Sequence, residues 1–461
     1  MKDSPVSIHY RYLLPATMTA ALGGLLFGYD TAVISGCIDY MEEFFQLSVA
    51  MKGWAASSAL VGCIVGALVA GFITDAIGRK HTLLLCSLLF TISAIGSAIP
   101  RTLTELVIAR IIGGLAVGAA SMTVPMYIAE LAPENVRGRL VSLYQLAVVV
   151  GISVVFFVNM LIQRQGSHEW NVNSGWRWMF GSETLPAVLF GVLLLGVPES
   201  PRWLMSKARL AEAQHILQRI TDRRRAQEIE QQIQATLQHE KGNFSEVFAP
   251  EFRPALLIGV CLAVFQQFSG INAVMYYAPS IFKAGGSDDQ SAFVQAVVIG
   301  AVNLLFTCVA IWQVDRRGRK SLLLIGAMVQ TLSLAGIGLL YHYQGPRLVL
   351  LVLILIYVAA FAMAMGPVVW ILIAEIFPNK VRGRAMTVAT FVLWGSCYLV
   401  SQTFPMLIGN PRIGSAKTFW MYSAVSLITL VFVWRVVPET KGRTLEEIEA
   451  GWLKQSLPAS S

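Results

Sequence analysis

The sequence predicts an all-α polytopic membrane protein, with twelve transmembrane helices in two pseudo-symmetric six-helix bundles and a cytoplasmic helical linker between them. Hydrophobic residues make up 55% of its 461 residues and charged residues only 13%, whereas roughly a quarter of an average soluble domain is charged. The apolar residues form long runs, and three charged motifs occur twice in the same order. A soluble core could not bury so much apolar surface, so these observations exclude an ordinary soluble protein.

The apolar runs are long enough to cross about 30 Å of hydrocarbon as helices. The N-terminus lacks a short apolar core followed by a small-residue cleavage site, so we expect the first span to be retained. Twelve spans are expected, near residues 11–36, 53–75, 83–100, 104–128, 139–163, 177–197, 254–282, 291–314, 321–341, 347–373, 384–409 and 416–437.

The distribution of Lys and Arg predicts the orientation of the spans, because these residues concentrate in cytoplasmic loops. With a cytoplasmic N-terminus, the cytoplasmic segments hold 26 of the 35 Lys and Arg residues, and the outer loops hold 8. Both termini are therefore predicted to be cytoplasmic. The net charge of +8 follows from this asymmetry, so it requires no nucleic-acid partner. All six cysteines lie in or beside spans, which makes a disulfide framework unexpected.

Three charged motifs are repeated half a chain apart. Asp75 to Lys80 returns in similar form as Asp315 to Lys320, and residues 129–139 return as residues 374–384. A Pro-Glu pair follows both the sixth and the twelfth span. The second copies are displaced by 240, 245 and 240 residues, so two homologous halves are predicted. In membrane transporters the interface between such halves holds the substrate.

The repeats and the composition divide the chain into four parts. We expect bundles at 1–200 and 251–440, a helical linker at 201–250 and a cytoplasmic tail at 441–461. The linker is rich in Arg, Gln and Glu, with apolar residues at roughly helical spacing, which is typical of amphipathic helices. It serves either as a tether with a solvated face or as a regulatory element.

Three charged residues lie more than one helical turn inside the predicted spans, where an unpaired charge is costly and marks a functional candidate. Asp30 lies deep in the first span, Arg110 in the fourth and Glu183 in the sixth, within reach of its outer end. A carboxyl group whose distance from a guanidinium changes also changes its proton affinity. This trio is therefore the candidate for proton coupling, and the alternative is a static ion pair that locks two helices.

Polar and aromatic side chains in other spans are suited to a neutral hydroxylated ligand, because amides bind hydroxyl groups and flat rings cover C–H surfaces. At 100° per residue Gln266 and Tyr277 share a helix face, but Gln267 joins them only if the helix unwinds, which Gly270 permits. The alternative for each residue is interhelical packing. The candidate substrate-binding residues are Phe27, Gln145, Gln266, Gln267, Asn272, Tyr276, Tyr277, Asn303, Trp370 and Trp394.

These motifs resemble those of the sugar porter family of the major facilitator superfamily. The resemblance rests on Gly-Tyr-Asp in span 1, the two Gly-Arg-Lys loops, Pro-Glu-Ser-Pro-Arg after span 6, Gln-Gln-Phe-Ser-Gly-Ile-Asn in span 7 and Pro-Glu-Thr-Lys-Gly-Arg after span 12. The pattern is most similar to bacterial xylose–proton symport, and it implies a bacterial inner membrane location. Facilitative glucose carriers usually have Asn where this chain has Asp30, which favours symport.

The chain departs from the family pattern at three positions of the implied sugar site. Ile152 stands where the xylose symporters have a second glutamine, Leu393 stands where relatives often have an amide, and Cys397 stands where they often have Asn. The second half of the site therefore offers fewer hydrogen-bond partners, and the identity of the sugar stays open.

The repeated motifs place acids and arginines at the cytoplasmic helix ends. The resemblance implies a gate in which they pair across the bundles when the cavity opens outward and separate when it opens inward. The alternative, that Lys and Arg only fix topology, leaves the repeated acids unexplained. The gate candidates are Asp75, Arg79, Glu130, Arg137, Arg139, Asp315, Arg319, Glu375, Arg382 and Arg384.

The function predicted from the sequence is proton-coupled import of a monosaccharide by alternating access, by a monomer. Its partners are the sugar, a proton and the lipid bilayer, with no cofactor, metal or nucleic acid. A facilitative uniporter, a myo-inositol or other polyol–proton symporter, and a sugar sensor are the alternatives. An enzyme is disfavoured, because the six His residues form no metal-ligand pattern and no nucleophile–base set is evident.

Overall fold

The computed structural model describes residues 9–239, 244–250, 252–377 and 381–441, and the protein is helical. Twelve helices or groups of helices are long and apolar enough to cross a membrane, so the prediction of twelve spans is confirmed. Residues 442–461 of the predicted tail lie outside the described residues. The first bundle contains α1 (Tyr10–Phe45), α2 (Val49–Ile77), α3 (Arg79–Ala98), α4 (Leu103–Leu131), α5 (Glu134–Gln163), α6 (His168–Trp170), the π-helix η1 (Asn171–Gly175), α7 (Trp176–Gly181) and α8 (Thr184–Leu195).

The linker is helical, as predicted, and the second bundle follows it. The linker contains α9 (Pro201–Ser206), α10 (Leu210–Ile220), α11 (Arg223–His239) and the 3-10 helix η2 (Phe244–Phe248). The second bundle contains α12 (Arg253–Phe268), α13 (Ile271–Tyr276), α14 (Ala278–Ala284), α15 (Asp289–Arg317), α16 (Arg319–Tyr343), α17 (Arg347–Met363), α18 (Met365–Ile376), α19 (Arg382–Ile408) and α20 (Gly414–Arg435).

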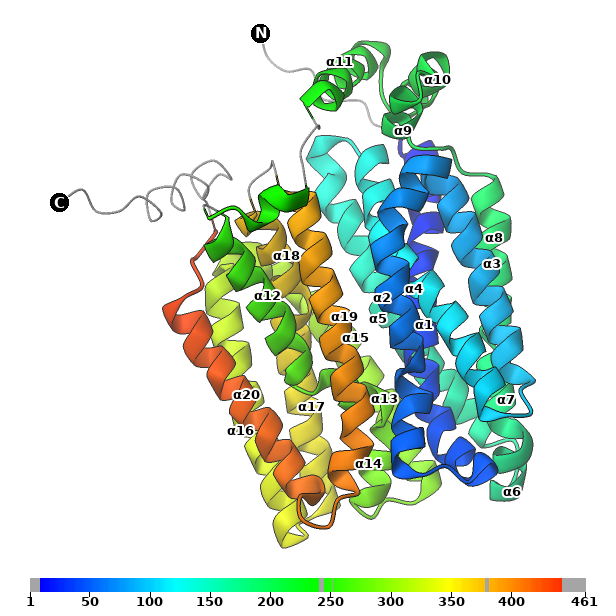
Figure 1. Ribbon diagram of the computed structural model, residues 1–461, viewed down its shortest axis with the longest axis vertical. Coiled ribbons are helices and arrows are strands. Elements are labelled where there is room, and N and C mark those ends of the chain that lie inside the picture. Colours follow the sequence, from blue (N-terminus) through cyan, green and yellow to red (C-terminus); the bar gives the residue numbers. More distant parts are fainter. Residues whose placement is uncertain (1–8, 240–243, 251, 378–380, 442–461) are drawn as a thin grey trace, which may run out of the picture.

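The two bundles lie side by side, and at one end of the molecule α9, α10 and α11 lie over the first bundle (Figure 1). We call this the linker end, and the opposite end, where α6 and α14 lie, the far end. Between the bundles α2 packs against α19, and α5 packs against α15. Any ligand held between the bundles is therefore surrounded by helices from both repeats.

Two spans of the second bundle are broken, and the breaks have local causes. The predicted single span at 254–282 consists of α12, α13 and α14, because Gly270 has a φ of +90°, which only glycine adopts readily. The predicted span at 347–373 divides into α17 and α18 at Ala364. Gly366 and Pro367 follow this break, and Pro367 has no N–H to donate to the preceding turn.

Close packing within the first bundle depends on glycine. A Cβ atom on Gly114 of α4 would lie 1.8 Å from the backbone oxygen of Ala59 on α2. This agrees with the expectation that small residues allow close approach of transmembrane helices.

We expect Gly114→Val to lower the melting temperature of the purified protein in detergent, because overpacking typically costs about 1–3 kcal/mol. Gly71→Val is the matched control, since a Cβ at Gly71 on α2 would meet nothing within 4 Å. Equal melting temperatures for the two variants would contradict the proposed role of Gly114.

Candidate functional site

A buried ion pair lies inside the first bundle. Asp30 on α1 and Arg110 on α4 are 0% and 1% exposed, and Arg110 Nη1 lies 2.8 Å from Asp30 Oδ1. The same nitrogen donates to the backbone oxygen of Asp30 at 3.1 Å. Two residues that are 80 positions apart in the sequence are thus held together by both side-chain and backbone contacts.

A second acid completes this cluster. Glu183, between α7 and α8, is 1% exposed, and its carboxyl group interacts with that of Asp30. The sequence left the depth of Glu183 in the membrane open, and the structure places it fully inside the bundle. Two carboxylates and one guanidinium carry a net charge of −1, and uptake of one proton makes the cluster neutral. The arrangement can therefore hold a proton in a site removed from water.

Amide side chains gather where α12 ends and α13 begins. Gln266 and Gln267 are 3% and 5% exposed, and Gln266 Nε2 donates to the backbone oxygen of Met365 at 2.7 Å. Gln267 Nε2 donates to Gln266 Oε1 at 3.3 Å, and Asn272 Nδ2 donates to Gln267 Oε1 at 2.5 Å. The break at Gly270 thus brings together the three predicted amide side chains of this span.

The two tyrosines of this span have different surroundings. The expectation that Gln266 and Tyr277 share one helix face is wrong, because the helix breaks at Gly270 and again at Tyr277. Tyr277 Oη donates to the backbone oxygen of Ser401 at 3.0 Å instead. Tyr276 Oη lies 4.0 Å from Cys397 Sγ, and Asn272 Nδ2 lies 3.0 Å from the same sulfur. Tyr276 therefore lies beside the amide cluster, and Cys397 is in contact with it.

Aromatic rings connect the two bundles. The rings of Phe27 on α1 and Trp394 on α19 have centroids 5.6 Å apart, and the Phe27 and Tyr144 centroids are 6.5 Å apart. Trp394 is 5% exposed. The other candidates are placed on α5, α15 and α18: Gln145 and Trp370 are half-buried and Asn303 is buried.

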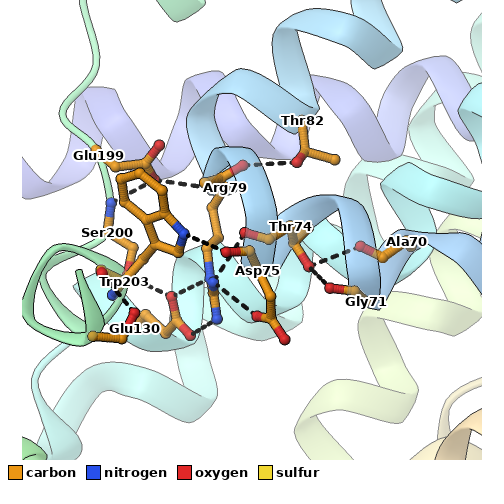
Figure 2. A network of polar contacts seen from close by, with 12 residues as sticks. Ala70, Gly71, Thr74, Asp75, Arg79, Thr82, Glu130, Glu199, Ser200 and Trp203 are labelled. Carbon is orange, nitrogen blue, oxygen red and sulfur yellow. Dashed lines mark hydrogen bonds and ion pairs between the residues drawn. The ribbon is translucent and has the colours of Figure 1, made fainter.

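The linker end of the first bundle holds a dense polar network (Figure 2). Arg79 makes two parallel bonds to Glu130, with Nε–Oε2 at 2.9 Å and Nη2–Oε1 at 3.0 Å, and its Nη1 lies 3.2 Å from Asp75 Oδ1. Glu199 Oε1 accepts from the backbone N–H groups of Arg79 and Lys80 at 3.0 and 3.1 Å. The network therefore ties the loop between α2 and α3 to α4 and to the segment that leads into the linker.

The second bundle repeats this network, as the repeated motifs predict. Arg319 pairs with Glu375, with Nη2–Oε1 at 2.8 Å and Nε–Oε2 at 3.2 Å, and Glu439 accepts from the backbone N–H of Arg319 at 3.0 Å. The pairs Arg79–Glu130 and Arg319–Glu375 each join helices of one bundle. The predicted pairing across the bundles, which belongs to an outward-open state, stays a prediction.

The remaining gate candidates contact backbone or linker atoms. Arg137 Nε donates to the backbone oxygen of Ala132 at 3.4 Å, and Arg382 Nε to that of Phe377 at 3.3 Å. Arg384 Nη1 lies 3.8 Å from Glu246 Oε2 in η2. Arg139 is exposed, and the side chain of Asp315 lies outside the described part of the chain.

An ionic network at the far end was missed in the sequence. Asp39 on α1 lies 3.0 Å from Lys52 Nζ on α2 and 3.1 Å from Lys283 Nζ on α14, and it accepts a hydrogen bond from Ser280 Oγ at 2.6 Å. Lys283 Nζ also lies 2.9 Å from Asp289 Oδ1 on α15. These contacts join the two bundles, and because their residues are scattered along the chain, no motif reveals them.

Two more contacts extend this far-end network. His168 on α6 lies between Glu43 and Asp289, with Nε2–Oε2 at 2.8 Å and Nδ1–Oδ2 at 3.5 Å. Tyr40 Oη donates to Asp289 Oδ2 at 3.4 Å. Groups from α1 and α6 therefore converge on one carboxylate of the second bundle.

Two repeated six-helix bundles, with buried charges in one and an amide cluster in the other, define a membrane transporter of the major facilitator type, and not an enzyme. The family model described as "Sugar (and other) transporter" matches residues 16–452. The chain belongs to this family.

Named relatives support the assignment over nearly the whole chain. The chain is 43% identical over 445 residues to the arabinose-proton symporter of Bacillus subtilis (strain 168), with 96% of both chains covered. It is 42% identical over 471 residues to the D-xylose-proton symporter of Escherichia coli (strain K12), again with 96% of both covered. An inward open structure of the xylose transporter XylE from E. coli superposes with a TM-score of 0.85 at 42% identity, covering 96% of this chain and all of that one.

Proposed function

We propose that this sugar–proton symporter imports a pentose or hexose by alternating access, with Asp30, Arg110 and Glu183 as its coupling cluster. Similar chains are named for arabinose, xylose and galactose symport with protons, and one for glucose transport. The observation that carries the proposal is the fully buried Asp30–Arg110 pair at 2.8 Å, with Glu183 beside it. Buried ionisable residues of this kind mark proton pathways in transporters.

Proton binding and sugar binding are connected through α1. Asp30 lies one helical turn from Phe27, whose ring contacts Trp394 of the second bundle. A proton on the cluster removes the charge that holds Asp30 to Arg110, so α1 is freed to move relative to α4. This movement displaces Phe27 at the bundle interface. Proton-coupled transport by alternating access requires such a coupling between the charge state and the bundle arrangement.

The sugar is proposed to lie between the bundles, against the amide cluster and the rings. Gln266, Gln267 and Asn272 supply donors and acceptors from the second bundle, and Gln145 supplies an amide from the first. Phe27, Trp370 and Trp394 supply apolar faces for the C–H surface of the sugar. Tyr276 and Asn303 complete the proposed set of sugar-contacting residues. Tyr277 is proposed to support the site indirectly, through its hydrogen bond to the backbone oxygen of Ser401.

The linker end is proposed to face the cytoplasm of a bacterial cell, with the protein in the inner membrane. The positive-inside distribution of Lys and Arg supports this orientation, and the described conformation is then closed to the outside by the far-end network. Similarity to inward open XylE structures agrees with this state. The linker-end charges are proposed to pair across the bundles in the opposite state. We also propose that the protein functions as a monomer. Its four parts are proposed to be the bundles at 1–200 and 251–440, the linker at 201–250 and the tail at 441–461.

The proposed function is tested by the external pH of lightly buffered, de-energised cells that overproduce the protein. Pulses of xylose, arabinose, glucose, galactose and myo-inositol are given in turn. Alkalinisation with a pentose or hexose is expected. Entry of radiolabelled sugar without a pH change would make the protein a uniporter, and a response to myo-inositol alone would make it a polyol symporter.

Gln266→Ala is expected to weaken sugar binding by at least about tenfold, since it removes hydrogen bonds worth about 1 kcal/mol each. Binding is measured by isothermal titration calorimetry on the purified protein. Gln165→Ala is the matched control, because the Gln165 amide is exposed and contacts only the backbone oxygen of Leu161 among the hydrogen bonds described. Unchanged affinity in Gln266→Ala would remove this residue from the sugar site.

A further inference from the structure

Tyr144 on α5 has a buried hydroxyl group whose hydrogen-bonding capacity is unused. Its Oη is inaccessible to solvent and has no hydrogen-bond partner among the described residues. Buried polar groups in folded proteins are nearly always paired, so an unpaired one needs an explanation. A role in hydrogen bonding to a ligand is one such explanation.

The position of the Tyr144 ring connects this hydroxyl to the bundle interface. The Tyr144 ring lies against Phe27, with centroids 6.5 Å apart, and Phe27 lies against Trp394 at 5.6 Å. The Nε1 atom of Trp394 is also buried without a partner within the described chain. Two unpaired polar groups, one from each bundle, therefore flank the same phenylalanine.

The ring of Tyr144 is held in place by close packing of α1 against α5. A Cβ atom on Gly24 would lie 2.8 Å from Tyr144 Cδ2, and one on Gly28 would lie 1.9 Å from the backbone oxygen of Val148. The helices α1 and α5 therefore pack closely at Tyr144 and again one turn further on, at Val148. A ring packed in this way presents its hydroxyl in one place, which is what recognition of a particular ligand atom requires.

We propose that Tyr144 is a specificity-determining residue of the transporter, and that its hydroxyl forms a hydrogen bond with a sugar hydroxyl group when the site is loaded. This inference rests on the proposed function. The tyrosine hydroxyl both donates and accepts, whereas the Trp394 indole only donates. A monosaccharide lying beside Phe27 satisfies both groups, since each of its hydroxyls can accept one bond and donate another. A sugar without a hydroxyl at the matching carbon leaves Tyr144 unpaired and is bound more weakly.

The experiment compares wild-type protein with Tyr144→Phe, which removes only the hydroxyl oxygen. Dissociation constants for D-xylose, L-arabinose, D-glucose and D-galactose, and for the monodeoxy derivatives of the tightest ligand, are measured by calorimetry. We expect Tyr144→Phe to bind the tightest sugar about tenfold more weakly, as for the loss of one hydrogen bond to a ligand. One deoxy derivative should bind equally to both proteins, because it lacks the hydroxyl that Tyr144 contacts.

The fold is checked by the melting temperature without sugar, which should not fall, because the deleted hydroxyl has no hydrogen-bond partner among the described residues. Tyr343→Phe is the matched control, since Tyr343 is 74% exposed at the end of α16, and it should bind all sugars as the wild type does. Equal affinities of wild type and Tyr144→Phe for every sugar would overturn the inference while leaving the proposed function intact. A wild type that binds none of the four sugars would overturn both.

Discussion

Asp30→Asn is expected to abolish uphill, proton-driven accumulation of sugar while downhill exchange across the membrane continues. The amide can still accept a bond from Arg110, but it cannot take up a proton. Glu183 and Arg110 then already balance each other, so the cluster no longer takes up the proton that neutralises it. Accumulation and exchange are measured with radiolabelled sugar in proteoliposomes, with and without an imposed pH gradient.

The variant is expected to fold, because Arg110 keeps a charged neighbour. Removing one partner of a buried ion pair commonly costs about 3–5 kcal/mol when the other charge is left unpaired. Here Glu183 is buried in the same cluster, and it can pair with Arg110 when Asp30 becomes neutral.

Asp288→Asn is the matched control for this substitution. Asp288 caps α15 by accepting from the backbone N–H of Ser291 at 3.1 Å, and asparagine caps helices equally well. It should therefore accumulate sugar as the wild type does. Accumulation by Asp30→Asn that persists under a pH gradient would show that the proton is carried elsewhere.

The spans and the two repeats could be predicted because their signals are local in the sequence. Hydropathy reports burial in lipid directly, and each charged motif is a short run of residues that is repeated in the same order in the second half. The meeting of Gln266, Gln267 and Asn272 was also accessible, since Gly270 marks the break that brings them together.

Other features depend on which helices meet, and single-sequence patterns carry no such information. The depth of Glu183 follows from the packing of α7 and α8 against α1, and Asp39 meets Lys283 only because α14 lies against α1. The helical-wheel prediction that Gln266 and Tyr277 share one face failed because it assumed an unbroken helix. The break at Ala364 was missed, although the Gly-Pro pair after it was a usable signal.

Lys283→Gln is expected to open the far end, by removing the cation that connects Asp39 on α1 with Asp289 on α15. Hydrogen–deuterium exchange should rise in residues 271–284, which form α13 and α14 against the first bundle. The Lys283 and Asp39 side chains are only about one-fifth exposed, so their ion pair is less screened by solvent and salt than a pair on the surface. If the substitution changes the free-energy difference between the closed and the open far end by 1.4 kcal/mol, the ratio of the two populations shifts about tenfold.

Lys417→Gln serves as the control at the same end of the molecule. Lys417 on α20 donates to the backbone oxygen of Arg412 at 2.7 Å, within its own bundle, so its loss should leave exchange in α13 and α14 unchanged. If Lys283→Gln likewise leaves exchange unchanged, the network does not hold the far end closed.

A charge swap between Asp39 and Lys283 is not expected to restore closure, although such swaps are a common test of ion pairs. A lysine at position 39 would face Lys52, and an aspartate at position 283 would face Asp289. The double variant Asp39→Asn with Lys283→Gln is the better test. The opening free energy measured by hydrogen–deuterium exchange in residues 271–284 is compared for the double variant and the two single variants. If the two residues pair directly, the single effects should be non-additive, with a coupling of about 0.5–3 kcal/mol. Additive effects would mean that each residue acts through its other partner. Such a coupling would identify a direct Asp39–Lys283 bond as one determinant of which side of the membrane the sugar site faces.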